Sequence, residues 1–208
     1  MTTAIADEIK VQAEEDEVAE LERRRFTASE YLKMAELGIL SPDEKLELID
    51  GQIFKKMSPI GTPHIWCVNR LNRLFSAKLF DKAFVSPQNP ISLDDYNDPE
   101  PDIVLLPLKQ TQERPSAKDA LLVVEVSDKT VRIDRNIKAP LYARFGVMEV
   151  WLVDLNAKRI EAHREPKDGV YRQTLIFDET QNIAPMNFPD IAFSVAEILG
   201  TKPLSNNA

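Results

Sequence analysis

The chain has 208 residues, of which 43% are hydrophobic, and a single cysteine, Cys67. This length allows one domain with a substantial core, and one cysteine excludes an intramolecular disulfide framework. No apolar run approaches the roughly 20 residues that cross a membrane, and the acidic N-terminus lacks the basic and apolar regions of a signal peptide, so we expect a cytoplasmic protein without membrane contact.

The negative charge is concentrated at the N-terminus. Residues 1–22 hold eight acidic residues against Lys10, a net −7, which leaves only −1 of the net −8 for residues 23–208. The overall charge therefore does not exclude a nucleic-acid partner, although phosphate binding needs basic residues. We expect a solvated or partly helical acidic tail over 1–22, with a partner-binding helix as the alternative, a single domain over 23–200 and a frayed end over 201–208.

The first part of the domain carries clear local signals. Thr27 and Glu30 have the spacing of a capping box, which predicts a short helix that ends near Gly38. Asp50-Gly51 between apolar stretches predicts a hairpin. Apolar residues at intervals of three or four then indicate an amphipathic helix over 64–79, and a short strand is expected around Phe84-Val85.

Two apolar runs follow, over 100–106 and 121–127, and both are typical of strands buried on two faces. The two-residue period of a strand places Leu121, Val123 and Glu125 on one face. If the two strands are neighbours, about 4.7–4.9 Å apart, Asp102 and Glu125 converge. Two carboxylates about 4 Å apart repel by roughly 4 kcal/mol at an effective dielectric of 20, so they need a cation, a basic side chain or a shared proton.

Apolar residues spaced by four predict a helix from about Val131 to Phe145. This segment is basic, with a net charge of +4 over residues 129–144, and Pro140 should kink or break it beside Lys138. Strands are expected over 148–155, 159–163 and 171–177, and a short helix over 195–199. The fold class is therefore α/β (α+β), a central mixed sheet flanked by helices with an N-terminal helix and hairpin.

This order of elements, with one acid entering the second strand and another late in the third, resembles the restriction-endonuclease-like or PD-(D/E)XK nuclease superfamily. Over roughly residues 25–200 the chain is more narrowly similar to the Uma-two family of restriction endonucleases. That likeness rests on the following segments: Glu47 to Gly51, Met57-Ser58-Pro59, His64, Pro101-Asp102, Val124 to Ser127, Lys138 to Tyr142, Gly146-Val147 and Trp151 to Asp154.

The resemblance implies a divalent metal, Mg²⁺ or Mn²⁺, bound by Asp102, Glu125 and the backbone carbonyl of Val126. Carboxylate oxygens suit these hard cations, and the sequence offers no Cys or His cluster for zinc. Ser127 stands where the superfamily usually has a lysine, and in the resembling family the lysine comes from the next helix, which here indicates Lys138. The resemblance also implies Glu47 as a third acid.

Ordinary structural roles remain open for several of these residues. Lys138 is spaced to form a surface ion pair with Asp134 on one helix face, and Glu47 is equally consistent with an exposed hairpin acid. His64 at a helix N-terminus and Tyr142 are more typical of a cap and of packing, and we treat both as auxiliary candidates. Asp102 has a capped turn after Pro101 as its alternative.

We therefore expect a metal-dependent endonuclease that hydrolyses phosphodiester bonds in DNA, and the resemblance makes a homodimer plausible. DNA would approach over four arginines: Arg70, Arg73, Arg132 and Arg135. Two alternatives remain. Ser127, Pro140 and the acidic tail favour a catalytically inactive module that binds nucleic acid or protein, and a metal-dependent hydrolase of another phosphate ester is the third reading.

Overall fold

A computed structural model describes residues 23–56, 61–109 and 113–204. The acidic tail predicted for 1–22, the Met57-Ser58-Pro59 motif and residues 205–208 of the predicted frayed end lie outside the described residues. Within these ranges, no helix is long and apolar enough to span a membrane.

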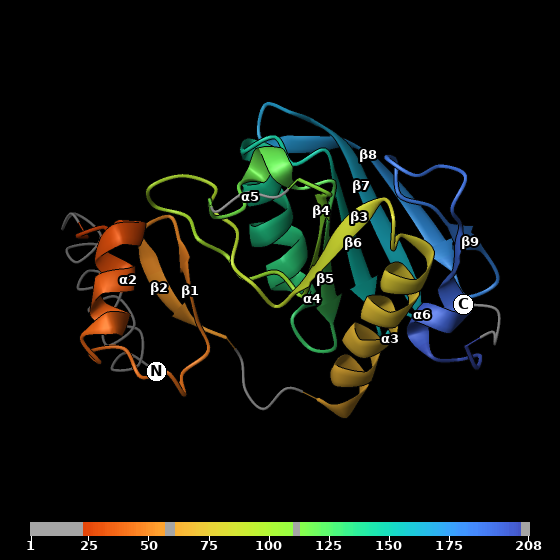
Figure 1. Cartoon of the computed structure of the whole chain (residues 1–208), viewed down its shortest axis with the longest axis horizontal. Helices are drawn as coiled ribbons and strands as arrows, with labels where there is room; N and C mark the ends of the chain where they lie inside the picture. Colours follow the sequence, from red (N-terminus) through yellow and green to blue (C-terminus); the bar gives the residue numbers. More distant parts are fainter. Residues whose placement is uncertain (1–22, 57–60, 110–112, 205–208) are drawn as a thin grey trace, which may run out of the picture.

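Residues 23–56 form an N-terminal lobe, which stands apart at the left of Figure 1. Helix α2 (Ala28–Glu36) begins at the predicted capping box, in which the Thr27 hydroxyl accepts from the Glu30 amide and the Glu30 carboxylate accepts from the Thr27 amide. The predicted hairpin is also present, as β1 (Leu46–Ile49) and β2 (Gln52–Lys55) in antiparallel pairing. Asp50 and Gly51 form its turn with φ of 49° and 74°, the positive values that such two-residue turns require.

A mixed sheet of six strands forms the body of the molecule, in the order β3-β4-β5-β6-β7-β8. The strands are β3 (Ala83–Pro87), β4 (Ile103–Pro107), β5 (Leu122–Ser127), β6 (Glu149–Asp154), β7 (Arg159–Lys167) and β8 (Val170–Asp178). Only β5 and β6 pair in parallel, and the other neighbours are antiparallel. The two apolar runs of the sequence are thus adjacent strands, β4 and β5.

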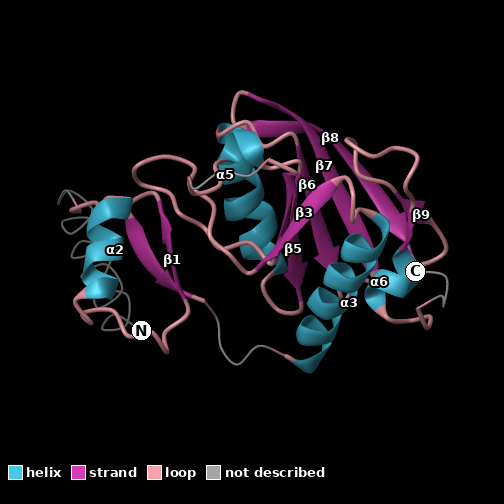
Figure 2. Ribbon diagram, in the orientation of Figure 1, coloured by secondary structure: helices cyan, strands magenta, loops and turns pink. Residues whose placement is uncertain are grey.

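Helices cover both faces of this sheet, as Figure 2 shows. On one face α3 (Thr62–Lys78) and α6 (Val195–Leu199) pack on the larger core cluster, which includes Phe75 and Trp151. The other face carries a helical segment of three parts, α4 (Val131–Ile133), η2 (Asp134–Lys138) and α5 (Ala139–Arg144). Three short elements that the sequence did not predict complete the described fold: the 3₁₀ turn η1 (Ala117–Asp119), and the paired strands β9 (Asn182–Ile183) and β10 (Phe193–Ser194).

Two details differ from the sequence predictions. The helix expected over 131–145 contains the π-helical segment η2, which ends two residues before Pro140. Proline lacks the amide hydrogen of a regular turn and its ring clashes with the carbonyl four residues earlier, so a widened turn at this point relieves both problems. Leu121 precedes β5 and packs with the core on the α3 side, whereas Val123 faces the other helices, so the predicted shared face holds only for Val123 and Glu125.

Candidate active site

The acids of the two central strands meet at one end of the sheet. Ile103 pairs with Val124 across the antiparallel β4–β5 ladder, and continuing that register places Asp102 opposite Glu125. Residues in opposite positions share a face of the sheet, with Cβ atoms about 4.5–5.5 Å apart. Both side chains are buried, at 8% and 4% exposure. Both residues line one cavity, and the convergence of their carboxylates stays a prediction.

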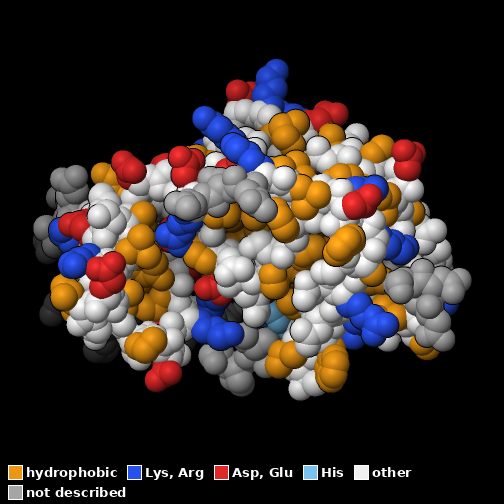
Figure 3. Space-filling view, viewed as in Figure 1, with side chains coloured by type: hydrophobic (Ala, Val, Ile, Leu, Met, Phe, Trp, Pro, Cys, Tyr) orange, Lys and Arg blue, Asp and Glu red, His pale blue; other side chains and the backbone are white. Residues whose placement is uncertain are grey.

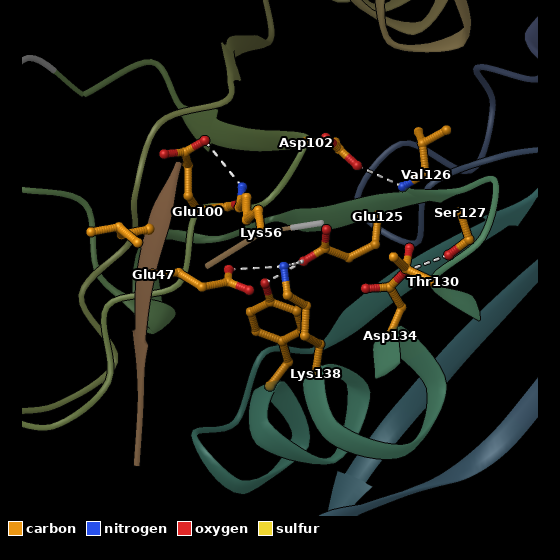
Figure 4. Close-up of polar contacts among 12 residues, drawn as sticks. Glu47, Lys56, Glu100, Asp102, Glu125, Val126, Ser127, Thr130, Asp134 and Lys138 are labelled. Atoms are coloured by element: carbon orange, nitrogen blue, oxygen red, sulfur yellow. Dashed lines mark hydrogen bonds and ion pairs between the residues drawn. The ribbon is translucent and has the colours of Figure 1, made fainter. Parts of the chain in front are cut away.

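Lys138 reaches Glu125 from the helical segment. Its Nζ lies 3.2 Å from Glu125 Oε1 and 3.0 Å from Glu47 Oε2, and only 5% of Lys138 is exposed (Figure 4). The Tyr142 hydroxyl donates to the same Glu125 oxygen at 2.6 Å. The surface ion pair considered for Lys138 is therefore wrong, and so is the exposed hairpin position considered for Glu47, because both side chains are buried.

Asp134, one helical turn before Lys138, fixes the start of η2. Its carboxylate accepts hydrogen bonds from the Ser127 hydroxyl and, at 2.9 Å, from the Thr130 hydroxyl. Ser127 is the last residue of β5 and is fully buried. The residue that replaces the superfamily's strand lysine therefore ties the strand to the helical segment that carries Lys138.

Two further contacts hold the other side of the site. His64, in the first turn of α3, places Nε2 3.1 Å from Asp102 Oδ2, and the Val126 amide donates to the same oxygen at 2.8 Å. Lys56 follows β2 and pairs with Glu100 at 3.1 Å, which links the N-terminal lobe to the segment before Asp102. No sequence signal indicated Lys56, because its partner lies 44 residues away.

The charges of the site explain its pKa values. Burial is the main cause that raises the pKa of Glu125 to about 8, and the carboxylates of Asp134, Asp102 and Glu47 act in the same direction. The ammonium of Lys138 acts in the opposite direction. Burial lowers the pKa of Lys138, but the carboxylates of Glu125, Glu47 and Asp134 outweigh burial and raise it. Lys138 therefore keeps its proton. Burial also opposes ionisation of Asp102, yet His64, the Val126 amide and Lys56 lower its pKa. The carboxylates of this cluster therefore outnumber its ammonium groups.

These side chains line a cavity of about 380 Å³ between the N-terminal lobe and the body. Figure 3 shows acidic and basic side chains close together where the lobe meets the body. The lobe is held there by backbone contacts, among them the Asp98 amide to the Leu48 carbonyl at 2.9 Å and the Gly51 amide to the Tyr96 carbonyl at 2.8 Å. The hairpin therefore forms a wall of the site and delivers Glu47 to it.

The donor set fits a hard divalent cation that keeps much of its water. Within the described ranges, no three His, Cys, Asp or Glu side chains come close enough together to hold a metal ion by themselves. Mg²⁺ is usually bound by one or two carboxylates and several waters, and Asp102 and Glu125 offer such a pair. The excess of carboxylates around Glu125 is the second observation that fits a cation. The Val126 amide holds Asp102, and a ligand role for the Val126 carbonyl stays a prediction.

The four arginines predicted to bind DNA differ in their surroundings. Arg132 and Arg73 are exposed. Arg135 forms a two-pronged ion pair with Glu161, at 3.1 and 2.7 Å. Arg70 donates to the carbonyls of Ile198 and Leu199 at the end of α6. All four assignments stay predictions, and only Arg132 and Arg73 have side chains without such partners within the described part of the chain.

Comparison with known proteins agrees with this geometry. The family model Uma2, described as "Putative restriction endonuclease", matches residues 28–196. A solved structure from Anabaena variabilis, described as a putative nuclease of DUF820, superposes with a TM-score of 0.65 at 17% identity, over 84% of this chain and 98% of that one. At this identity the likeness shows the fold alone.

A second solved structure, the type IIG restriction endonuclease BpuSI, gives a TM-score of 0.40 at 20% identity, over 69% of this chain and 16% of BpuSI, and we draw nothing from it. No curated protein matches the chain. The family resemblance predicted from the motifs and the predicted fold class are both confirmed. The chain belongs to the Uma2 family of restriction-endonuclease-like proteins.

Proposed function

We propose that this protein is a metal-dependent endonuclease that hydrolyses phosphodiester bonds in DNA. One observation carries the proposal: Asp102 and Glu125 lie at the same end of two paired, buried strands and line one cavity, where a lysine from the next helical segment pairs with Glu125. A structural ion pair would not require a third buried acid, Glu47, nor a cavity beside it. Membership of a family described as restriction endonucleases supports the same reading.

Asp102 and Glu125, with the Val126 carbonyl, would hold Mg²⁺ or Mn²⁺, which supplies polarisation of the scissile phosphate and a lower pKa for the attacking water. Lys138 keeps its positive charge at the cavity and stabilises the negative charge that develops on the phosphate oxygens. His64 and the Val126 amide orient Asp102, while Tyr142 orients Glu125. Hydrolysis adds water to phosphorus, breaks one ester P–O bond and leaves a proton on the departing oxygen.

The test is cleavage of supercoiled plasmid and of single-stranded circular DNA in Mg²⁺ or Mn²⁺. We expect the wild type to cleave at least one of the two substrates, Glu125→Ala to cleave neither, and EDTA, which chelates the metal, to abolish cleavage. Asp81→Ala is the matched control, because Asp81 is an exposed acid that pairs with its neighbour Lys82 outside the cavity. Equal activity in Glu125→Ala and Asp81→Ala would contradict the proposal.

A second candidate is a catalytically inactive module of the same fold that binds nucleic acid. Ser127 in place of the strand lysine, together with the engagement of Lys138 in two ion pairs, favours it. In that case the protein binds DNA but cleaves neither plasmid nor single strands with any divalent metal. Measuring DNA binding and cleavage on the same sample separates the two candidates.

A further inference from the structure

The cavity contains an apolar surface that phosphodiester hydrolysis does not use. Phe54, Ile133 and Ile137 all line it beside Asp102 and Glu125, and they are 45%, 39% and 48% exposed. Exposure of this size leaves their side chains available for contact with a ligand. Since an aliphatic or aromatic surface offers nothing to a phosphate, these residues must face another part of whatever binds there.

The register of the hairpin directs Phe54 to the acids. Glu47 and Phe54 are opposite partners in the β1–β2 ladder, so their side chains lie on the same face of the hairpin. Glu47 reaches Lys138 from that face. Ile137 and Ile133 directly precede Lys138 and Asp134 in sequence and lie on the opposite wall. The apolar surface therefore stands next to the reacting end of the cavity, on both of its walls.

The size of the cavity restricts what can enter it. About 380 Å³ is the volume of a small-molecule site, for which roughly 300–1,000 Å³ is usual. A nucleotide unit is of that kind, whereas a duplex is not. In a duplex the faces of the bases are covered by their stacked neighbours, so only an unpaired base can lay its face on an aromatic side chain.

The rim of the cavity carries charges that suit a strand passing through. Lys45 and Lys129 line the cavity and are exposed, and neither forms an ion pair with another residue in the described ranges. Lys45 lies on the lobe and Lys129 follows β5. Two ammonium groups on opposite sides can contact the phosphates that flank the bound nucleotide.

From this geometry we propose that the cavity takes one nucleotide of an unpaired DNA strand, with its base against Phe54, Ile133 and Ile137 and its phosphate at the end of the cavity where Asp102 and Glu125 would hold the metal. The substrate class is then single-stranded DNA, or duplexes with unpaired tails, rather than intact duplex. This inference rests on the proposed nuclease function, because it assigns the phosphate to the same acids.

The test is binding of a labelled single-stranded oligonucleotide and of a blunt duplex of the same sequence, measured by fluorescence anisotropy. The measurement is made in Ca²⁺, another hard cation with oxygen ligands, and in EDTA. We expect tighter binding of the single strand, a loss of about 10-fold in Phe54→Ala, and wild-type binding in Phe54→Tyr, which keeps the aromatic face. Phe80→Ala is the control, because Phe80 is 85% exposed and lies outside the cavity.

Duplex binding as tight as single-strand binding would overturn the proposal, and so would equal affinities in Phe54→Ala and Phe80→Ala. A folded Phe54→Tyr variant with the weak binding of Phe54→Ala would do the same. Because binding is measured without cleavage, the two proposals fail separately. Single-strand binding that depends on Phe54 in a protein that cleaves nothing would sustain this inference and contradict the nuclease.

Discussion

Two buried glutamates on the neighbouring parallel strands β5 and β6 have opposite surroundings. Glu149 is fully buried, and its carboxylate accepts hydrogen bonds from Trp151 Nε1 at 2.9 Å, Arg164 Nε at 2.8 Å and the Met186 amide at 2.7 Å. Glu125 shares Lys138 with Glu47 and lies beside other acids. One carboxylate is surrounded by donors, whereas the other competes for a single cation.

Under the proposed function, this difference separates a structural carboxylate from one that would bind a metal ion. Burying a charge is costly unless it is paired and hydrogen-bonded, and the contacts of Glu149 meet that requirement within the chain. Glu125 accepts from Lys138 and Tyr142 but lies among other acids, and burial together with those acids raises its pKa to about 8. A buried acid with too few donors of its own is what a site for an external cation requires.

The largest expected effect on stability is at Glu149. Replacing Glu149 by Ala leaves the guanidinium of Arg164 without its partner, and breaking such a buried pair costs about 3–5 kcal/mol in the free energy of unfolding. In metal-free buffer, Glu125→Gln should change that free energy by less than about 1 kcal/mol, because it removes one of the acids that compete for Lys138. Urea unfolding of both variants checks the contrast, and equal losses would remove the distinction between the two glutamates.

Lys138 should have a large effect on the rate of DNA cleavage. Lys138→Met removes the positive charge that faces the phosphate, and the loss of one such group typically lowers kcat about 100- to 1,000-fold. The measurement is the single-turnover rate of DNA cleavage in saturating Mg²⁺. Cleavage at the wild-type rate would show that Lys138 only balances the acids.

A smaller effect is expected at the junction between β5 and η2. Ser127→Ala removes one donor from the buried carboxylate of Asp134, which should cost about 1–2 kcal/mol of stability. Because Asp134 fixes the turn that carries Lys138, cleavage should also slow at saturating DNA. Ser86→Ala is the control, since the hydroxyl of the half-buried Ser86 accepts a hydrogen bond only from Asn89 among the described residues. Equal rates in the two variants would deny Ser127 a positioning role.

A further effect is the pH dependence of stability in EDTA. Since folding raises the pKa of Glu125 from 4.5 to about 8, the folded protein holds a proton that the unfolded chain has released between those values. The free energy of unfolding should therefore fall as pH rises through this window. Glu125→Gln should flatten the fall, and urea unfolding at several pH values measures it. An unchanged slope in the variant would mean that other groups cause the dependence.

Much of the fold follows from local sequence signals. The Thr27–Glu30 capping box, the Asp50-Gly51 turn and the buried apolar runs each determine structure within a few residues, and all three predictions are confirmed. The need of Glu125 for a partner also followed, because an isolated carboxylate in a buried strand is costly, and Glu125 contacts Lys138 and Tyr142. The sheet order beyond β4 and β5 depends on contacts between distant segments.

The parts that the sequence did not reveal depend on tertiary contacts. Pro140 predicted a disturbed helix, but not that a π-helical segment would direct Lys138 to both Glu47 and Glu125. The ion pair of Arg135 with Glu161 spans 26 residues, and the contacts of Arg70 with α6 span more than 100. Basic residues in a helix pattern look alike in sequence, whether they face solvent or a distant carbonyl.

The central claim is that Asp102 and Glu125 hold a divalent cation that the chain itself does not replace. Isothermal titration of the purified protein with Mn²⁺ and Mg²⁺ tests it most directly, because it needs no DNA. We expect saturable binding by the wild type, and loss of that binding in both Glu125→Gln and Asp102→Asn, with Asp81→Ala unchanged. Binding of equal strength in all four proteins, or none in the wild type, would contradict the account.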